Sequence, residues 1–144
     1  MDKRIIILGL FVLLTACSTQ ETTNYEHRDV IINDINIDVE IADSFSVQMQ
    51  GLMYREELGE YSGMLFIFPD EIERTFWMKN TLIPLDMIFI DSNMKIVKIV
   101  QAKPCIKDPC EHYPSERAAM YVLEVNKGFS ESHGIKEGNI VLIR

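Results

Sequence analysis

The chain has 144 residues, the length of about one domain. Hydrophobic residues make up 47% of it and charged residues 25%, which excludes an intrinsically disordered chain. Fourteen Lys and Arg residues against 22 Asp and Glu residues give a net charge of -8, which excludes a basic nucleic-acid-binding protein.

Residues 1–16 have the pattern of an export signal. A charged start that includes Lys3 and Arg4 precedes an unbroken apolar run over residues 5–14. A helix of that length spans roughly 15 Å, about half of a bilayer's hydrocarbon core, so it fits a signal peptide better than a transmembrane helix. The run ends in Leu14-Thr15-Ala16-Cys17, which resembles the lipobox of bacterial lipoproteins. An ordinary signal peptide with a chance cysteine is the alternative.

Lipidation of Cys17 would attach the mature chain to a membrane. Two or more acyl chains hold a protein firmly on a bilayer, so we expect an exported protein anchored to a bacterial envelope membrane. In a cell with two membranes, Ser18, where an Asp would indicate inner-membrane retention, favours the outer membrane, facing the periplasm. Residues 17–27 are then the lipidated cysteine and a polar, flexible tether, and residues 28–144 the globular domain.

The globular part begins with a predicted β-hairpin and a short helix. Residues 30–32 and 35–41 are strand-like and flank Asn33-Asp34, a turn sequence. In the second strand, apolar and polar residues alternate, which predicts one buried face. Ser44 is placed to cap a short helix that runs through Leu52.

The rest of the chain predicts a mainly β fold. A second short helix is expected over residues 128–133, ended at Gly134. Two of the predicted strands, 64–68 and 87–90, are apolar on both faces, so the sheet must be covered on both surfaces. We therefore expect a β-rich α+β fold, a compact single-domain barrel or sandwich of about eight strands with two short helices. The further strand candidates are residues 64–68, 75–78, 85–91, 95–102, 120–125 and 139–143.

Two cysteines remain after Cys17. Cys105 and Cys110 flank a turn-prone Asp-Pro pair, and an even number of cysteines in an exported protein favours a disulfide bond. A soft-metal site that adds His112 is the first alternative, but it lacks a fourth ligand and the spacing typical of zinc sites. A redox-active pair is the second alternative, although the two-residue spacing of thioredoxin-like motifs is absent.

Several motifs in the globular part stand in a characteristic order. They are residues 51–55 (GLMYR), 63–68 (GMLFIF), 76–91 (FWMKNTLIPLDMIFID), 113–115 (YPS) and 119–125 (AMYVLEV). Over residues 30–144 the chain resembles the domain of unknown function 192 family. The resemblance implies a small β-rich fold, often exported, with no settled activity, and it places the Pro104-Cys105 pair and Cys110 at the family's own cysteine positions.

The familiar catalytic and metal-binding motifs are absent from the sequence. There is no nucleophile elbow, zinc helix or phosphate-binding loop. His27, His112 and His133 have no sequence neighbour that would make them catalytic, and we interpret them as surface residues. Eight methionines raise the hypothesis of a Cu(I) site, but most lie in apolar runs, where Met fills the core. We therefore expect no metal ion and no cofactor.

The tryptophan-centred motif is the best candidate for a binding site. Trp77 offers a stacking surface, Lys79 and Asn80 offer hydrogen-bonding groups, and Arg55 offers a bidentate clamp, which together suit an anionic or sugar-like ligand. Asp86 opens an apolar strand and needs a partner, for which Lys79 and Arg55 are the candidates. The alternative is that Asp86 and one of these cations form only an internal ion pair.

Three functions remain open. The preferred hypothesis is a non-enzymatic envelope domain that binds a small ligand, peptide or glycan through Arg55, Trp77, Lys79, Asn80 and Asp86. The second is a hydrolase or transferase that acts on envelope polymers, with Asp86 or Asp91 as the acid or base. The third is a scaffolding or assembly factor that meets another envelope protein.

Overall fold

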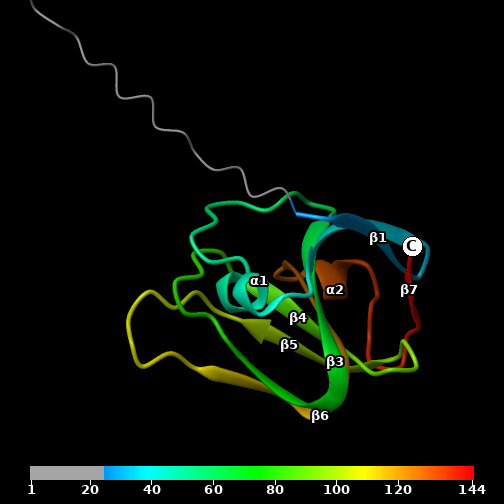
Figure 1. Ribbon diagram of the computed structural model, residues 1–144. Helices are drawn as coiled ribbons and strands as arrows, with labels where there is room; N and C mark the ends of the chain where they lie inside the picture. Colours follow the sequence, from blue (N-terminus) through cyan, green and yellow to red (C-terminus); the bar gives the residue numbers. More distant parts are fainter. Residues whose placement is uncertain (1–24) are drawn as a thin grey trace, which may run out of the picture.

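A computed structural model describes residues 25–144 as a mostly β fold. The predicted signal peptide, Cys17 and residues 18–24 lie outside the described residues. Seven strands form one curled sheet in the order β5-β4-β6-β3-β2-β1-β7 (Figure 1). The elements are β1 (His27–Ile32), β2 (Ile35–Ala42), α1 (Phe45–Gln50), β3 (Ser62–Trp77), β4 (Leu85–Ile90), β5 (Ile96–Ala102), β6 (His112–Asn126), α2 (Phe129–Ser132) and β7 (Val141–Ile143). The predicted β-rich class and the two short helices are confirmed.

The strand count is seven rather than about eight because two predicted strands are one. Residues 64–68 and 75–78 both belong to β3, which pairs antiparallel with β6 over nearly its whole length. The pairing register shifts between Ile67 and Ile72 and again between Glu73 and Thr75. Bulges of this kind bend a strand without ending it, so the polar stretch after Pro69 is a bend within β3 and not a loop.

The predicted β-hairpin is confirmed. β1 and β2 pair antiparallel, and the turn residues Asn33 and Asp34 have φ angles of 50° and 65°. Two consecutive positive φ values belong to a type I′ turn, whose twist matches that of the flanking strands. β2 then pairs in parallel with β3, and the crossover between these two strands carries α1.

The sheet curls until its two edges meet at one end. Lys95, just before β5, forms a β-bridge with Ile140, just before β7. The backbone N–H of Ile96 also donates to the carbonyl of Asn139, at 2.9 Å. The fold is therefore a half-barrel that is pinned together at one end, close to the barrel alternative predicted from the sequence.

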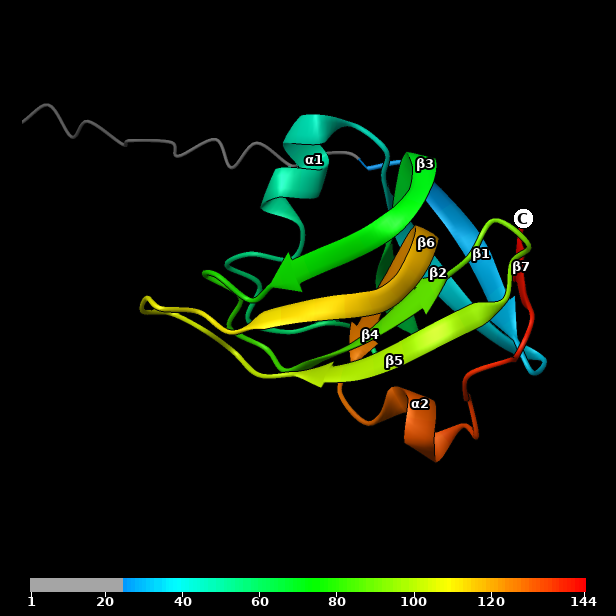
Figure 2. The same ribbon diagram turned by 90° about the horizontal axis from the view of Figure 1, so that it is seen from below.

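Each face of the sheet has its own hydrophobic core. The α2-side core contains Leu65, Ile88 and Phe129, and the α1-side core contains Phe66 and Phe89. All six residues of β4 are buried, as expected for a strand with apolar side chains on both faces. The two short helices lie on opposite sides of the molecule (Figure 2).

Among residues 25–144, no helix combines the length and apolar character needed to cross a bilayer.

Candidate functional site

A groove of about 450 Å³ runs between α1 and the bent part of β3. α1 has only six residues and none of them is fully buried, although Val47 packs against the α1-side core. Phe45 is 79% exposed and Trp77 is 43% exposed, although both are large and apolar. We call this feature the aromatic groove. Its lining residues are Phe45, Gln48, Met49, Phe66, Phe68, Pro69, Asp70, Arg74, Thr75, Phe76 and Trp77.

The aromatic wall of the groove is rigidly packed. The ring of Phe76 meets the rings of Phe66, Phe68 and Phe89 edge to face, at centroid distances of 5.1, 6.3 and 5.9 Å. Edge-to-face pairs of this kind add to the stability that burial alone provides. The wall is therefore formed before any ligand arrives.

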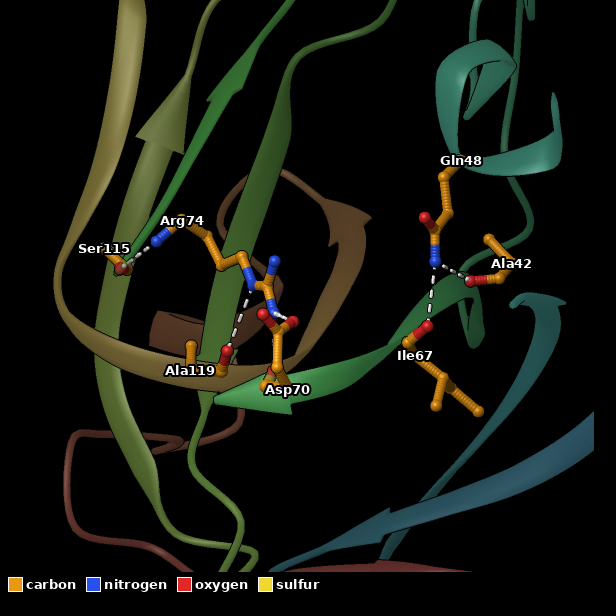
Figure 3. Close-up of polar contacts among 7 residues, drawn as sticks. All are labelled: Ala42, Gln48, Ile67, Asp70, Arg74, Ser115 and Ala119. Atoms are coloured by element: carbon orange, nitrogen blue, oxygen red, sulfur yellow. Dashed lines mark hydrogen bonds and ion pairs between the residues drawn. The ribbon is translucent and has the colours of Figure 1, made fainter. Parts of the chain in front are cut away.

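Gln48 holds α1 against the sheet. Its side-chain Nε2 donates to the carbonyl of Ala42 at 3.1 Å and to the carbonyl of Ile67 at 2.8 Å (Figure 3). These two carbonyls come from β2 and β3, so one amide ties the helix to both strands. The carboxamide oxygen of Gln48 has no donor among the described residues, so it can accept a hydrogen bond at the groove.

Arg74 fixes the other polar side of the groove. Its Nε donates to the carbonyl of Ala119 at 3.2 Å and its Nη2 donates to the Asp70 carboxylate at 2.5 Å (Figure 3). The backbone N–H of Arg74 donates to Ser115 Oγ at 2.9 Å. The guanidinium also lies 4.0 Å from the ring centre of Phe68, a cation–π contact. Both charges at this end of the groove are therefore already paired.

A second, smaller cavity of about 40 Å³ adjoins the groove. It contains Glu124, a residue on the central strand β6, whose cross-strand neighbours are the buried Met64 and Met87. We call it the inner cavity. It shares with the aromatic groove the lining residues Gln48, Met49, Phe66, Phe76 and Trp77.

Glu124 is the unusual group of this site. It is only 4% exposed, and within residues 25–144 no side chain or backbone N–H hydrogen-bonds to its carboxyl. Burial raises the pKa of Glu124 from its ordinary value of 4.5 to about 8, because a low-dielectric environment disfavours the charged form. The carboxyl is therefore mostly protonated at pH 7.

The segment after α1 forms part of the wall of the inner cavity. Gly51 has a φ of +49°, and a Cβ atom on it would lie 3.2 Å from Cζ of Phe66. Both the left-handed backbone and the close approach favour glycine. Leu52 follows as a buried residue of the α1-side core and lines the cavity.

Of the residues predicted from the sequence, Trp77 lines the groove and Arg55, Lys79 and Asn80 do not. The Arg55 guanidinium makes two hydrogen bonds of 2.5 Å to the Glu40 carboxylate, which raise the pKa of Arg55. Lys79 pairs with the exposed carboxylate of Asp108.

The Asn80 amide donates to the hydroxyl of Tyr54 at 2.8 Å. The two cations that were expected to receive an anionic ligand, Arg55 and Lys79, are thus each paired with a carboxylate of the chain itself.

The prediction that Lys79 or Arg55 neutralises Asp86 is wrong. Asp86 is fully buried, and its two carboxylate oxygens accept the backbone N–H groups of Gly128 and Ser130, at 3.0 and 2.9 Å. These N–H groups lie at the start of α2, where they have no partner within the helix. Asp86 therefore caps α2 from the neighbouring strand, on the face of the sheet opposite the groove.

The disulfide bond between Cys105 and Cys110 is confirmed, with a Cα–Cα distance of 5.8 Å. Since both sulfurs are bonded to each other, neither is a free thiolate for the metal site with His112. The carbonyl of Cys105 accepts the backbone N–H of Asn80, at 2.8 Å. The disulfide loop thus supports the turn that follows Trp77.

No group of three or more His, Cys, Asp and Glu side chains in the described part of the chain is placed to hold a metal ion. His27 hydrogen-bonds to Asp38 at 2.9 Å, and the ring of His133 lies 4.2 Å from that of Phe129. Asp91 accepts two backbone N–H groups of the turn that follows it, as expected of a turn residue. None of these side chains lines the aromatic groove or the inner cavity.

Sequence reasoning did not select Glu124, Gln48 or Arg74. Glu124 carried a readable signal, because it is the one charged residue in the apolar run 120–125. A lone acid in such a strand is buried or marks an irregularity, and Asp86 stands in the same kind of apolar strand. Gln48 and Arg74 carried no such signal. Ala42 and Asp70 are close to them in the sequence, but Ile67 and Ala119 lie 19 and 45 positions away, and only the fold brings these partners together.

Known proteins resemble this chain in both sequence and structure. The model of the DUF192 family, described as an uncharacterised ACR, matches residues 28–143. A UPF0127 protein of Pyrococcus furiosus is 28% identical over 108 residues, which cover 74% of this chain and 86% of that protein. A UPF0127 protein of Pyrococcus horikoshii is 33% identical over 100 residues, which cover 66% of this chain and 77% of that protein.

Two solved structures share the fold. A provisionally assigned transcription regulator from Sinorhizobium meliloti matches with a TM-score of 0.76 at 34% identity, covering 83% of this chain and 95% of that one. A protein of unknown function from Novosphingobium aromaticivorans matches with a TM-score of 0.76 at 31% identity, covering 85% and 89% of the two chains.

Proposed function

The chain belongs to the DUF192 family, and we propose that this member is a membrane-anchored, non-enzymatic binding domain of the bacterial cell envelope. Its ligand is a small molecule or a peptide side chain that lies in the aromatic groove. The observation that carries the proposal is the groove itself, about 450 Å³ in volume and lined mainly by aromatic and aliphatic side chains. Ligand sites in proteins have this size and this composition, with a few fixed polar groups.

The polar groups around the groove support binding rather than catalysis. The Gln48 amide and the Arg74 guanidinium are committed to backbone carbonyls and to Asp70. They are placed to orient a ligand, because their own positions are fixed. Among residues 25–144, no Ser, Cys or His, the usual nucleophiles and bases, lines the groove or the inner cavity.

The hydrolase hypothesis is weakened because Asp86, its first candidate for the acid or base, has another role. Asp86 holds two backbone N–H groups and lies on the other face of the sheet. Within the described part of the chain, Glu124 is the only titratable residue that lines the inner cavity, whereas glycoside hydrolysis ordinarily needs two carboxyl groups on either side of the bond.

The Sinorhizobium structure is described as that of a transcription regulator. The net charge of -8 on this chain is unfavourable for binding a phosphate backbone, so it does not support the same role here.

Trp77 makes the proposal directly testable, because it is the only tryptophan of the chain and it lines the groove. We expect a small aromatic probe such as 2-phenylethanol to shift the fluorescence of Trp77 saturably. The matched variant Met49→Asp should weaken this binding, since it places a charge in the apolar wall. A saturable shift that Met49→Asp leaves unchanged would place the probe outside the groove and count against the proposal.

The membrane anchor is proposed from Cys17 and the signal that precedes it. The disulfide between Cys105 and Cys110 supports export, because such bonds persist in oxidising compartments. Cys17→Ser should abolish incorporation of labelled palmitate and release the chain from the membrane fraction. Unchanged labelling of that variant would remove the anchor from the proposal and leave the groove untouched.

A further inference from the structure

Glu124 is only 4% exposed, it lines the inner cavity, and its carboxyl has no hydrogen-bond partner among residues 25–144. Buried polar groups are hydrogen-bonded in nearly all native structures, and an exception calls for an explanation. A buried acid costs free energy, so an apolar residue between Met64 and Met87 would make the strand more stable. The inner cavity in front of Glu124 is large enough for one polar group of a ligand, since one water-sized probe needs about 10–15 Å³.

We propose that the inner cavity is a subsite for the ammonium group of a primary amine, with the Glu124 carboxylate as its counter-ion. This proposal rests on the proposed function of the aromatic groove. The apolar part of such a ligand would lie in the groove and its charged end in the inner cavity, and Phe66 and Trp77 line both spaces. A lysine side chain and a free aralkyl amine share this chemistry.

The walls between the groove and the cavity suit a cation. Phe66, Phe76 and Trp77 line both spaces, and the faces of aromatic rings attract ammonium groups. The paired Arg74 and Asp70 lie at the groove but are not among the residues that line the inner cavity. The charge of -8 on the whole chain also favours the approach of cations over anions.

No other described charge competes for the carboxyl. From β3 and β4, the cross-strand neighbours of Glu124 are Met64 and Met87. From the other elements, the inner cavity is lined by residues that neither titrate nor carry charge: Gln48, Met49, Gln50, Gly51, Leu52, Met53, Phe66, Phe76, Trp77 and Thr81. Titration of this site therefore reports on Glu124 alone.

The Glu124 carboxyl can ionise near neutral pH to bind a cation. With a pKa of about 8, about one carboxyl in ten is ionised at pH 7 and about nine in ten at pH 9. If only the ionised form binds an ammonium group, the association constant rises about tenfold over that range. An alkyl ammonium group stays mostly protonated over this range, since even the lysine ammonium has its ordinary pKa near 10.4, above pH 9.

The test compares 2-phenylethylammonium with its neutral isostere 2-phenylethanol. The full chain is reconstituted in vesicles of digalactosyldiacylglycerol, a lipid with neither charge nor amine, and binding is followed by Trp77 fluorescence from pH 7 to pH 9. We expect the ammonium probe to bind at least tenfold more tightly than the alcohol at pH 9, with an affinity that falls about tenfold by pH 7. Glu124→Gln should remove both the preference and the pH dependence, and the exposed control Glu73→Gln should change neither.

Each other outcome has a definite meaning. If both probes bind with equal affinity, or if Glu124→Gln keeps the preference for the amine, the subsite is refuted and the groove stands as a binding site. If Asp70→Asn removes the preference instead, the amine binds at the outer end of the groove and the subsite is again refuted. If neither probe affects Trp77, the proposed function fails and the subsite fails with it.

Discussion

Glu124 should make the stability of the protein fall as the pH rises. Its pKa is about 8 in the folded chain and 4.5 as an ordinary glutamate. Between those pH values the folded state therefore binds more protons than the unfolded state, so the free energy of unfolding decreases with rising pH. The difference of 3.5 pKa units corresponds to about 5 kcal/mol above pH 8 and to about 3 kcal/mol at pH 7.

Glu124→Gln keeps the shape of the side chain and removes the titration. We expect the variant and the unmodified chain to be equally stable near pH 4, and the variant to be about 3 kcal/mol more stable at pH 7. Urea unfolding followed by circular dichroism from pH 4 to pH 9 measures both. All other acids titrate in both chains, so the difference between the two curves isolates Glu124.

The matched control is Glu73→Gln, an exposed glutamate on β3, which should leave the pH dependence as it is. Two parallel stability curves for the unmodified chain and Glu124→Gln would refute the reasoning, because they would mean that Glu124 ionises as easily in the fold as in water.

Three further substitutions test other contacts by thermal or urea unfolding. Asp86→Ala should cost about 3 kcal/mol, because it strips two buried N–H groups of their acceptor; a loss near zero would mean that Asp86 does not cap α2. Lys79→Met should lower the free energy of unfolding by less than about 1 kcal/mol, since its partner Asp108 is exposed. A loss near 3 kcal/mol would instead support the hypothesis of an internal ion pair between Lys79 and Asp86. Replacing Cys105 and Cys110 by serine should cost about 2 kcal/mol, the chain-entropy value for so short a loop, and an unchanged midpoint would show that the bond does not constrain the unfolded chain.

The strands were predictable wherever local pattern decides the structure. The alternation in residues 35–41 and the Asn33-Asp34 turn define the first hairpin without any help from the rest of the chain. The two-sided apolar character of residues 87–90 was enough to place that strand between two cores. The bend of β3 was not predictable, because the polar residues that follow Pro69 read as a loop, and only the pairing with β6 keeps them in the sheet.

The candidate site was only partly predictable, since it depends on pairings between distant residues. The sequence indicates that Trp77 and Asp86 are unusual, but it does not tell that Asp86 meets the start of α2, more than forty positions later. The sequence offered Arg55 and Lys79 as ligand contacts or as partners of Asp86, because their actual partners, Glu40 and Asp108, are not neighbours in the sequence. Glu124 shows the opposite case, since its isolation within an apolar strand was visible in the sequence.

The most direct measurement is the two-dimensional NMR spectrum of the ¹⁵N-labelled chain during titration with 2-phenylethylammonium. The only tryptophan gives one indole N–H signal, from Trp77, and Gln48 provides a side-chain amide on the other side of the groove. We predict that these two signals shift together and saturably, while the side-chain amide of Asn80 stays in place. Shifts confined to Asn80 and its neighbours around Arg55 and Lys79, with Trp77 and Gln48 unmoved, would contradict a binding site in the aromatic groove.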